Sequence, residues 1–372
     1  MKNVYYHFWK PERIATPIDE LLSRLNLYAD IYQTQSQGQT LKVLISEKDF
    51  RLIARHEIYS SISFIQVSYG KNNLVNLMKI QRAVKRVDKF PGLWVPNDPF
   101  KSFGIAVLLK LIFFRKMKIQ LQLHGIVPRN LKGGLKSQIT GLLFCISMLF
   151  SYSIRTVSQA EFERLRKLKL LSNKKIFLAP VPVSIPEEVT AHKHIASSKM
   201  KIVSLGRIHE ERGIYLLSEI IQSTVSSSSD VEFHIVGSGE LLPKLRQSLS
   251  QEIKSGLCTV YGDLRGEELS SVLLQMDTLI NCAPIESYGL AMREALMRGV
   301  SIFALENQAT KALRMQYPAF VVLFHDAIEA TAMIKERSAF REIASAEVLR
   351  IREEFRDQNL KHISSVAQSW LV

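Results

Sequence analysis

The 372-residue sequence predicts an α/β protein built from two doubly wound, Rossmann-like domains. Short runs of β-branched and apolar residues alternate with helix-forming segments along the whole chain, a pattern typical of βαβ units and parallel sheets. The predicted strands are more numerous than those of a typical single open sheet. The length agrees, because roughly 100–200 residues per domain gives two domains. The apolar fraction of 47% is ordinary for a folded chain.

The first half of the chain alternates strands and helices. We expect strands at Val4–Phe8, Leu41–Ile45, Ile62–Val67, Leu93–Val95, Lys118–Leu123, Ile154–Val157 and Lys175–Leu178. We expect helices at Ile18–Tyr32, Leu74–Val84, Phe103–Phe114, Leu135–Met148 and Gln159–Leu170. A helix between consecutive strands returns the chain to the same edge of the sheet, so the strands run parallel.

The second half repeats this alternation. We expect strands at Lys201–Leu205, Glu232–Val236, Cys258–Tyr261, Thr278–Asn281, Ser301–Ala304 and Ala319–Leu323. Helices fill the gaps, and a last helix near Val348–Ala367 is expected to pack back toward the N-terminal domain.

The domain boundary is expected in the polar segment Ser184–Lys199, which lacks periodicity and carries Pro186. We therefore divide the chain into an N-terminal domain (1–185), a linker (186–199), a C-terminal domain (200–350) and a C-terminal helix (351–372). Ligands of doubly wound domains bind at the carboxyl ends of the parallel strands. Two such domains facing each other would form a cleft, with one substrate bound from each side.

The net charge of +14 is distributed unevenly. Residues 1–190 carry 29 Lys and Arg against 13 Asp and Glu, which is +16, and the remainder carries 20 against 22, which is −2. This asymmetry indicates either a solvated basic face or a partner with negative charge. The candidate partners are an anionic membrane leaflet, a lipid phosphate and nucleic acid.

Two apolar segments of the first half bear on a membrane location. The run Ile139–Tyr152 is shorter than the roughly 20 residues of a spanning helix, so we expect a buried or interfacial helix. The segment Ile105–Lys118 is apolar and then basic, which suits either a membrane-surface helix or a core helix followed by a basic turn. No secretory signal is expected at the N-terminus.

The three cysteines, Cys145, Cys258 and Cys282, lie in apolar surroundings and form no CxxC pair. We expect buried thiols in a reducing compartment, and neither a disulfide framework nor a zinc site.

The segment Pro284–Leu296 follows a predicted strand and enters a helix near Tyr288. Unpaired amides of Tyr288, Gly289 and Leu290 at a helix start favour an anion such as phosphate. Glu286 on the preceding loop and Glu294 about two turns later offer bidentate acceptors for the vicinal hydroxyls of a sugar or ribose. Taken alone, such a pair also suits a solvated helix.

Three further strand ends carry candidate nucleotide-binding residues. Arg207 and Arg212 flank the turn after Lys201–Leu205, and guanidinium groups grip phosphate oxygens bidentately. Gly237, in Val-Gly-Ser-Gly, suits a tight turn beside a nucleotide, because a dehydrogenase fingerprint would need a third glycine. Gly262, in Tyr-Gly-Asp, ends a strand where backbone groups could meet a base.

In the first domain, His124 ends the strand Lys118–Leu123 and could bond a sugar hydroxyl. The other eight histidines show no ligand-like spacing, and neither HExxH nor DxD is present at the predicted strand ends, so no metal site is expected.

These elements, in this order, resemble the C-terminal domain of the GT-B glycosyltransferases of family 4 over roughly Lys201–Ala304. The resemblance implies a metal-independent transferase that retains anomeric configuration and needs no cofactor. It implies that Glu286 lies beside the donor sugar, that Glu294 binds the ribose hydroxyls and that His124 contacts the transferred sugar. Arg207 and Arg212 would hold the diphosphate, although the family usually has Lys at the second position.

The expected function is transfer of a hexose-type sugar from a nucleotide-diphosphate donor to a glycan or lipid-linked glycan, in synthesis of cell-surface polysaccharide or lipopolysaccharide. We expect Glu286, His124, Arg207 and Arg212 to be catalytic, and Glu294, Tyr288, Gly289, Leu290, Gly237 and Gly262 to bind the donor. The location would be the cytoplasm or the inner face of the cell membrane, through the basic domain. The alternatives are a nucleotide-sugar epimerase on the same fold and a basic nucleic-acid-binding protein.

Overall fold

The computed structural model describes residues 3–7, 18–53, 60–70, 72–89, 91–99, 101–124, 135–183, 185, 199–336 and 342–371. The chain divides into two compact units. Unit 1 comprises Met1–Pro182 and Asn359–Val372, and unit 2 comprises Val183–Gln358. Of the expected linker 186–199, residues 186–198 lie outside the described residues.

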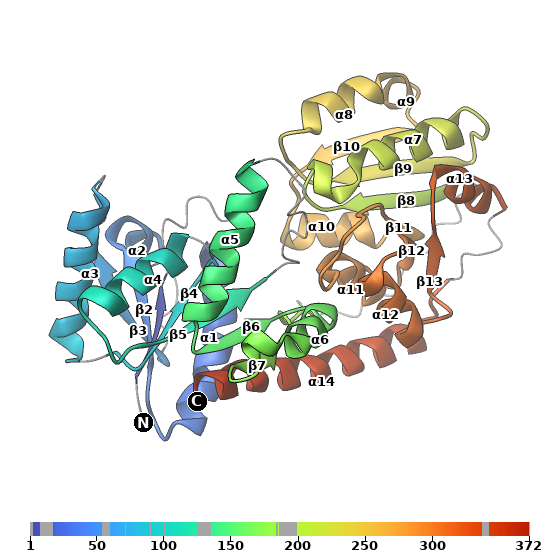
Figure 1. The fold of residues 1–372 in the computed structure, drawn as a ribbon. Helices are drawn as coiled ribbons and strands as arrows, with labels where there is room; N and C mark the ends of the chain where they lie inside the picture. The colour runs from blue at the N-terminus through green and yellow to red at the C-terminus, as the bar shows by residue number, and fades with distance from the viewer. Residues whose placement is uncertain are drawn as a thin grey trace. The chain divides into compact units, whose positions relative to one another are not determined.

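Unit 1 contains a seven-stranded parallel sheet in the order β3-β2-β1-β4-β5-β6-β7 (Figure 1). Its strands are β1 (Val4–His7), β2 (Leu41–Ser46), β3 (Ile62–Val67), β4 (Leu93–Pro96), β5 (Lys118–Leu123), β6 (Ser153–Thr156) and β7 (Lys175–Leu178). Because β1 lies between β2 and β4, the strand order reverses beside it. This is the doubly wound topology that the alternation predicts.

The helices of unit 1 cover both faces of this sheet. They are α1 (Ile18–Gln35), α2 (Glu47–Ile53), α3 (Asn73–Val87), α4 (Lys101–Ile112), α5 (Leu135–Phe150), α6 (Gln159–Lys167) and the 3-10 turn η2 (Lys169–Leu171). One core forms where α3, α4 and α5 pack on the sheet around Ile80, Phe103 and Phe144. The opposite core is formed by α1 and the chain's last helix.

Unit 2 contains a six-stranded parallel sheet in the order β10-β9-β8-β11-β12-β13. Its strands are β8 (Met200–Leu205), β9 (Val231–Val236), β10 (Cys258–Gly262), β11 (Thr278–Asn281), β12 (Ser301–Leu305) and β13 (Val321–Phe324). Its helices are η3 (Glu210–Arg212), α7 (Ile214–Val225), α8 (Leu242–Ser248), α9 (Ser250–Lys254), α10 (Gly266–Leu273), α11 (Leu290–Leu296), α12 (Gln308–Gln316) and α13 (Ala327–Glu336). Fully buried Ile202, Leu279 and Ile302 form the middle of the sheet.

The last helix, α14 (Ser345–Trp370), begins in unit 2 and ends in unit 1. Its first half buries Phe355 against Tyr317 of unit 2, and Arg352 Nε donates to the carbonyl of Met297 at 2.7 Å. Its end places Trp370 edge-on to Tyr28 and Tyr32 in the core of unit 1. The expected packing of the C-terminal helix on the first domain is thus confirmed.

Two details differ from the expected elements. The seven-residue helix α2 was not expected, because it follows β2 directly and is too short to show a periodicity; Ser46 begins it by accepting a hydrogen bond from the Asp49 amide at 3.0 Å. The expectation of three buried thiols is wrong for Cys145, which is exposed on the outer face of α5, whereas Cys258 and Cys282 are buried. Leu142, three residues before Cys145, is exposed as well, whereas Phe144 is buried.

Of the helices in the described part of the chain, none combines the length and apolar composition that a bilayer crossing requires.

Candidate functional site

The carboxyl edge of the unit 2 sheet carries the residues that the sequence predicts for a donor site. Strand β8 lies between β9 and β11, so the chain turns to opposite sides of the sheet after β8 and β11. Such a switch point leaves a crevice between the two diverging loops. Arg207 and Arg212 lie on the loop after β8, and Glu286 and Tyr288 lie on the loop after β11.

The loops after β8, β9 and β10 are tied together by backbone hydrogen bonds. Gly206 N donates to the carbonyl of Val236 at 3.0 Å, and Gly237 N donates to the carbonyl of Gly262 at 2.6 Å. Gly237 has φ +145°, and a Cβ there would lie 1.8 Å from the carbonyl oxygen of Gly206. Only glycine allows this approach. The structure therefore brings Gly237 and Gly262 together and gives Gly237 a structural role.

A second glycine contact joins the loop after β8 to the loop after β11. Gly213 has φ +70°, and a Cβ there would lie 1.9 Å from the carbonyl oxygen of Cys282. Because this contact is with backbone, no side-chain movement could relieve it. Gly213 thus fixes how closely Arg212 approaches the β11 loop.

Arg212 and Glu286 form an ion pair across the switch point. Arg212 Nη1 donates to Glu286 Oε2 at 2.7 Å, and the Ser287 amide donates to Glu286 Oε1 at 3.0 Å. The Glu286 side chain is 8% exposed and that of Arg212 is 33% exposed. Both carboxylate oxygens therefore have donors, while a guanidinium with five N–H donors keeps others for a ligand. The sequence indicated both residues but not this contact, which joins positions 74 residues apart.

Arg207 is held much more loosely. Its only ion pair in the described residues is with Glu211 at 3.4 Å, and both side chains are at least half exposed. Exposed pairs of this kind contribute about 0–1 kcal/mol. The guanidinium can therefore leave Glu211 for an anion at little cost.

Helix α11 begins at Leu290, two residues after Tyr288, near which its start was expected. Gly289 is the N-cap, with φ +73° and ψ +53°, a left-handed conformation that an α-helix cannot contain. The Arg293 amide makes the first helical hydrogen bond, to the carbonyl of Gly289 at 3.2 Å. The amides of the first turn are consequently those from Leu290 onward, and Tyr288 and Gly289 belong to the approach loop.

Arg293 is a site residue that the sequence reasoning missed. It is buried, its guanidinium lies 3.8 Å from the ring centroid of Tyr288, and its Nη1 donates to the Tyr288 carbonyl. Desolvation lowers the pKa of Arg293, while the nearby Tyr288, Tyr317 and Glu286 raise it. Arg293 therefore holds the loop between Glu286 and Gly289 in place. The sequence shows only an arginine five residues after Tyr288, because its burial is visible in the structure alone.

Glu294 lies on the same helix and is half-buried. Its backbone carbonyl accepts from Arg298 Nη1 at 2.9 Å, and Arg298 also donates to Ser270 Oγ at 3.1 Å. Arg298 thus binds the carbonyl of Glu294 near the end of α11 and joins it to Ser270.

An aromatic side chain that the sequence reasoning did not single out lies near the end of β10. Tyr261 is 39% exposed and stacks on His234 with ring centroids 5.9 Å apart, while His234 Nδ1 lies 3.0 Å from Tyr261 Oη. Gly262 follows with φ +88°. The pair presents a fixed, partly exposed ring beside the predicted Gly262.

His124 belongs to unit 1, where it directly follows β5 and is exposed. Desolvation by the surrounding protein, and the positive charges of Arg155 and Arg24, lower its pKa to about 4. Because the side chain itself remains accessible, a ligand can still reach it. At neutral pH the ring is uncharged, with one donor and one acceptor nitrogen. The basic loop 126–134 that follows lies outside the described residues.

Among the described residues, no three His, Cys, Asp or Glu side chains come together as candidate metal ligands.

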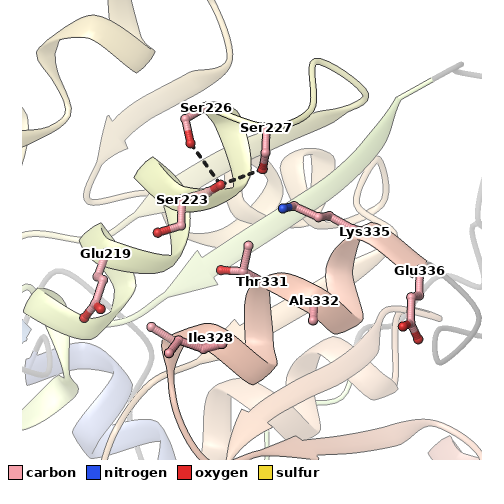
Figure 2. Close-up of a pocket in the computed structure, with 10 residues that line it drawn as sticks. Glu219, Ser223, Ser226, Ser227, Ile328, Thr331, Ala332, Lys335 and Glu336 are labelled. Atoms are coloured by element: carbon pink, nitrogen blue, oxygen red, sulfur yellow. Dashed lines mark hydrogen bonds between the residues drawn. The ribbon is translucent and has the colours of Figure 1, made fainter.

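A cavity of about 670 Å³ lies elsewhere in unit 2, between α7 and α13. Figure 2 shows Ser223, Ser226 and Ser227 facing Thr331 and Lys335 across it. Both helices start at the carboxyl edge of the sheet, so these residues lie toward its amino edge. None of the predicted site residues lines this cavity.

Comparisons with known proteins find sequence similarity within unit 2 and structural similarity over the whole chain. Residues 199–336, most of unit 2, match the family described as Glycosyl transferases group 1. Over 110 residues the chain is 29% identical to the phosphatidylinositol N-acetylglucosaminyltransferase GPI3 subunit of Saccharomyces cerevisiae, covering 30% of this chain and 24% of that protein. The matched part thus spans about a quarter of the curated relative's length.

Solved structures match the whole chain at low identity. The Anabaena protein Alr3699/HepE in complex with UDP and glucose matches with a TM-score of 0.63 and 12% identity, covering 97% of this chain and 98% of that one. Sucrose-phosphate synthase from Thermosynechococcus elongatus matches with a TM-score of 0.65 and 14% identity, covering 99% and 97%. The chain therefore has the GT-B fold, and residues 199–336 are similar to the glycosyl transferases group 1 family.

Proposed function

We propose that this protein is a retaining glycosyltransferase of family 4, which moves a hexose-type sugar from a nucleotide-diphosphate donor to a glycan or lipid-linked glycan. The observation that carries the proposal is the switch point of unit 2, where Arg212 meets Glu286 and Arg207 stands loosely paired beside them. The group 1 match covers this region. The Anabaena neighbour, a complex with UDP and glucose, supports a nucleotide-sugar as the ligand.

In this proposal the diphosphate occupies the crevice between the loops after β8 and β11. Arg207 leaves Glu211, Arg212 uses the N–H groups that Glu286 does not occupy, and the first-turn amides from Leu290 add their donors. Negative charge grows on the leaving phosphate during transfer. Fixed guanidinium and amide donors stabilise this charge in a site that needs no metal ion.

Glu286 and Glu294 take different parts of the donor. Glu286 is fixed by Arg212 and the Ser287 amide, so its position relative to the diphosphate is set before the sugar arrives. It would lie beside the donor sugar, and Glu294 would accept the ribose hydroxyls. Tyr261 offers a face for the base, next to Gly262. We place the acceptor on unit 1, where neutral His124 would bond a hydroxyl of the transferred sugar.

The acceptor is proposed to be a glycan or lipid-linked glycan at an anionic membrane surface, in synthesis of cell-surface polysaccharide such as lipopolysaccharide. The charge of +16 on residues 1–190 supports such a surface. The enzyme would act in the cytoplasm, at the inner face of the membrane.

A thermal-shift screen against UDP-, GDP- and CDP-linked sugars tests the donor half. A ligand at about 100 times its dissociation constant adds about 2.7 kcal/mol of stability, which gives a readable rise in melting temperature. The double variant Arg207→Ala/Arg212→Ala should lose the rise. The proposal fails if no nucleotide-sugar stabilises the protein, or if the double variant responds like the wild type.

Incubating the stabilising donor with and without acceptor separates transfer from isomerisation. A glycosyltransferase forms a glycosidic bond only when an acceptor is present, whereas an epimerase converts the donor sugar into its epimer without an acceptor. Conversion of the donor without acceptor would therefore replace the proposed function by the epimerase alternative.

A further inference from the structure

The outer face of two neighbouring helices in unit 1 is apolar where a surface helix is ordinarily polar. On α4, the side chains of Leu108, Leu111 and Ile112 are 45–54% exposed. On α5, those of Leu142, Ile146 and Leu149 are 39–61% exposed. Their spacings of three, four and seven residues align them along one side of each helix. We call these six side chains the α4–α5 face.

The two helices are neighbours on the same side of the sheet. They contact each other, and their inward residues Phe103 and Phe144 share one core (Figure 1). The inward-facing side chains of α4 and α5 already complete that core, so the outer apolar side chains are not needed to form it. The α4–α5 face is an additional apolar surface, and contiguous surfaces of this kind mark protein or membrane contacts.

Positive charge borders the face at the amino edge of the sheet. Arg115 and Lys116 are exposed in the turn that follows α4. Lys174 Nζ donates to the carbonyl of Leu149 at 2.8 Å, at the end of α5. Desolvation lowers the pKa of Lys110, and the positive charge of Lys174 lowers it further. The end of each helix thus carries a basic group.

Negative charge is missing from this part of the sequence altogether. Residues 99–160, which span α4, β5, α5 and β6, contain nine Lys and Arg and no Asp or Glu. These positions include the buried strands β5 and β6, but the exposed positions of α4, of the turn after it and of α5 also lack Asp and Glu. A surface adapted only to water, or to a second copy of itself, has no reason to exclude acidic residues there. A surface that faces anionic lipid does, because each carboxylate would be repelled.

We propose that the α4–α5 face docks on an anionic lipid bilayer, with its six apolar side chains entering the headgroup region and the basic groups meeting lipid phosphates. The α4–α5 face would thus be the surface through which the protein contacts the membrane in the proposed function. It rests on that location and not on sugar transfer, and vesicle binding tests it alone. Partial insertion of apolar side chains combined with basic residues is how monotopic proteins bind membranes.

Cys145 supplies a built-in probe. It lies on the same side of α5, between Leu142 and Leu149, and is exposed, while Cys258 and Cys282 are buried. A polarity-sensitive maleimide should therefore label Cys145 selectively. Its emission should shift to the blue with vesicles of phosphatidylcholine that contain about 30% of the anionic lipid phosphatidylglycerol. It should not shift with vesicles of pure phosphatidylcholine.

Vesicle co-sedimentation of unlabelled protein gives the quantitative test. The variant Leu142→Glu/Leu149→Glu should lower the partition coefficient about tenfold or more, because apolar contacts are replaced by repelled charges. Arg115→Glu/Lys116→Glu should lower it about fivefold or more for each basic residue lost. The matched control is Met315→Glu/Ile328→Glu, which adds the same charge to exposed apolar positions of unit 2 and should bind like the wild type.

Three results would overturn the proposal. One is no binding to the anionic vesicles at low salt. Another is binding that the leucine variant leaves unchanged, since a purely electrostatic contact does not need the apolar face. The third is a dimer in the absence of lipid that Leu142→Glu/Leu149→Glu dissociates, which would make the face a contact between copies. Nucleotide-sugar stabilisation should be intact in every variant, so failure here is distinguishable from failure of the proposed reaction.

Discussion

Each of the two sheets reverses its strand order beside its first strand, and the residues at the two reversals differ in kind. In unit 2 the reversal between β8 and β11 holds the Arg212–Glu286 ion pair, with the guanidinium one-third exposed. In unit 1 the reversal between β1 and β4 holds His7, which is fully buried, with Nε2 3.1 Å from Tyr69 Oη. Desolvation lowers the pKa of His7 to about 3, so its ring is neutral.

The comparison separates what the fold provides from what the residues provide. The same topology places a switch point in both units, yet a buried neutral ring cannot balance a diphosphate, whereas two accessible guanidinium groups can. The donor is therefore assigned to unit 2, and the packing at the unit 1 switch point is assigned to stability.

The largest effect is expected from Arg207→Ala. Removal of one guanidinium donor to the charge that develops on the leaving phosphate should reduce the rate of transfer by about 10²–10³-fold, with little change in melting temperature because Arg207 is exposed. Turnover measured with the donor found by thermal shift checks it. Arg314→Ala, at an exposed position of the same unit, is the control and should retain activity. Near-wild-type turnover of Arg207→Ala would remove this residue from the site.

Gly213→Ala should destabilise unit 2 by about 3 kcal/mol, because the added Cβ meets the Cys282 carbonyl and the backbone is left-handed. Gly256→Ala is a matched control, since Gly256 has φ +77° and no atom within 4 Å of the added Cβ. That control should lose only the free energy needed to hold alanine in a left-handed backbone conformation, about 1–2 kcal/mol. Equal losses in urea unfolding would show that the two loops are not in the close contact described.

A double-mutant cycle on Arg212→Gln and Glu286→Gln measures the ion pair itself. The coupling should lie between about 0.5 and 3 kcal/mol in the free protein, because the carboxylate is buried and the guanidinium is partly exposed. Glu286→Gln should keep the fold and lose transfer. A coupling near zero, or an unfolded Glu286→Gln protein, would contradict the description of a preformed and mainly functional pair.

A further effect is expected in the pH dependence of the stability of unit 1. A histidine with a folded pKa near 3 and an ordinary unfolded pKa contributes stability above about pH 6.5 and loses it as the pH falls toward 3. The loss is about 1.4 kcal/mol for each pH unit in that window. The pKa of His124 is also lowered, so His124 adds a loss of stability of the same sign. The test is therefore the difference in stability between wild type and His7→Gln.

Tryptophan fluorescence isolates the response of unit 1, because the three tryptophans, at positions 9, 94 and 370, all belong to it. Between pH 6 and pH 4.5, the urea stability of His7→Gln should fall less steeply than that of wild type. Identical slopes would mean that His7 does not stay neutral in the folded protein.

Much of the fold follows from the sequence because each strand is a short apolar run between helix-forming segments. Ile62–Val67, Lys118–Leu123, Lys175–Leu178 and Thr278–Asn281 have the predicted ends. Helix α2 escaped prediction because seven residues directly after a strand show no periodicity. The start of α11 was predicted only to within two residues because an aromatic residue and a glycine before a helical pattern do not reveal which of them has the left-handed backbone.

The site was predictable in its residue types but not in its contacts. Arg212 and Glu286 were identified by their positions after strands, whereas their ion pair depends on Gly213 packing against Cys282, a contact between distant segments. Arg293 was missed because its role comes from stacking on Tyr288, which only the turn at Gly289 makes possible. The α4–α5 face was anticipated only as two apolar segments, because exposure cannot be read from composition.

The most direct test of the central claim is a crystal structure of the protein with the nucleoside diphosphate of its stabilising donor. We predict density for the diphosphate at the β8–β11 switch point, within hydrogen-bonding distance of the guanidinium groups of Arg207 and Arg212, with the first turn of α11 facing it. Diphosphate density in the cavity between α7 and α13, or an unoccupied switch point at saturating ligand, would contradict the account.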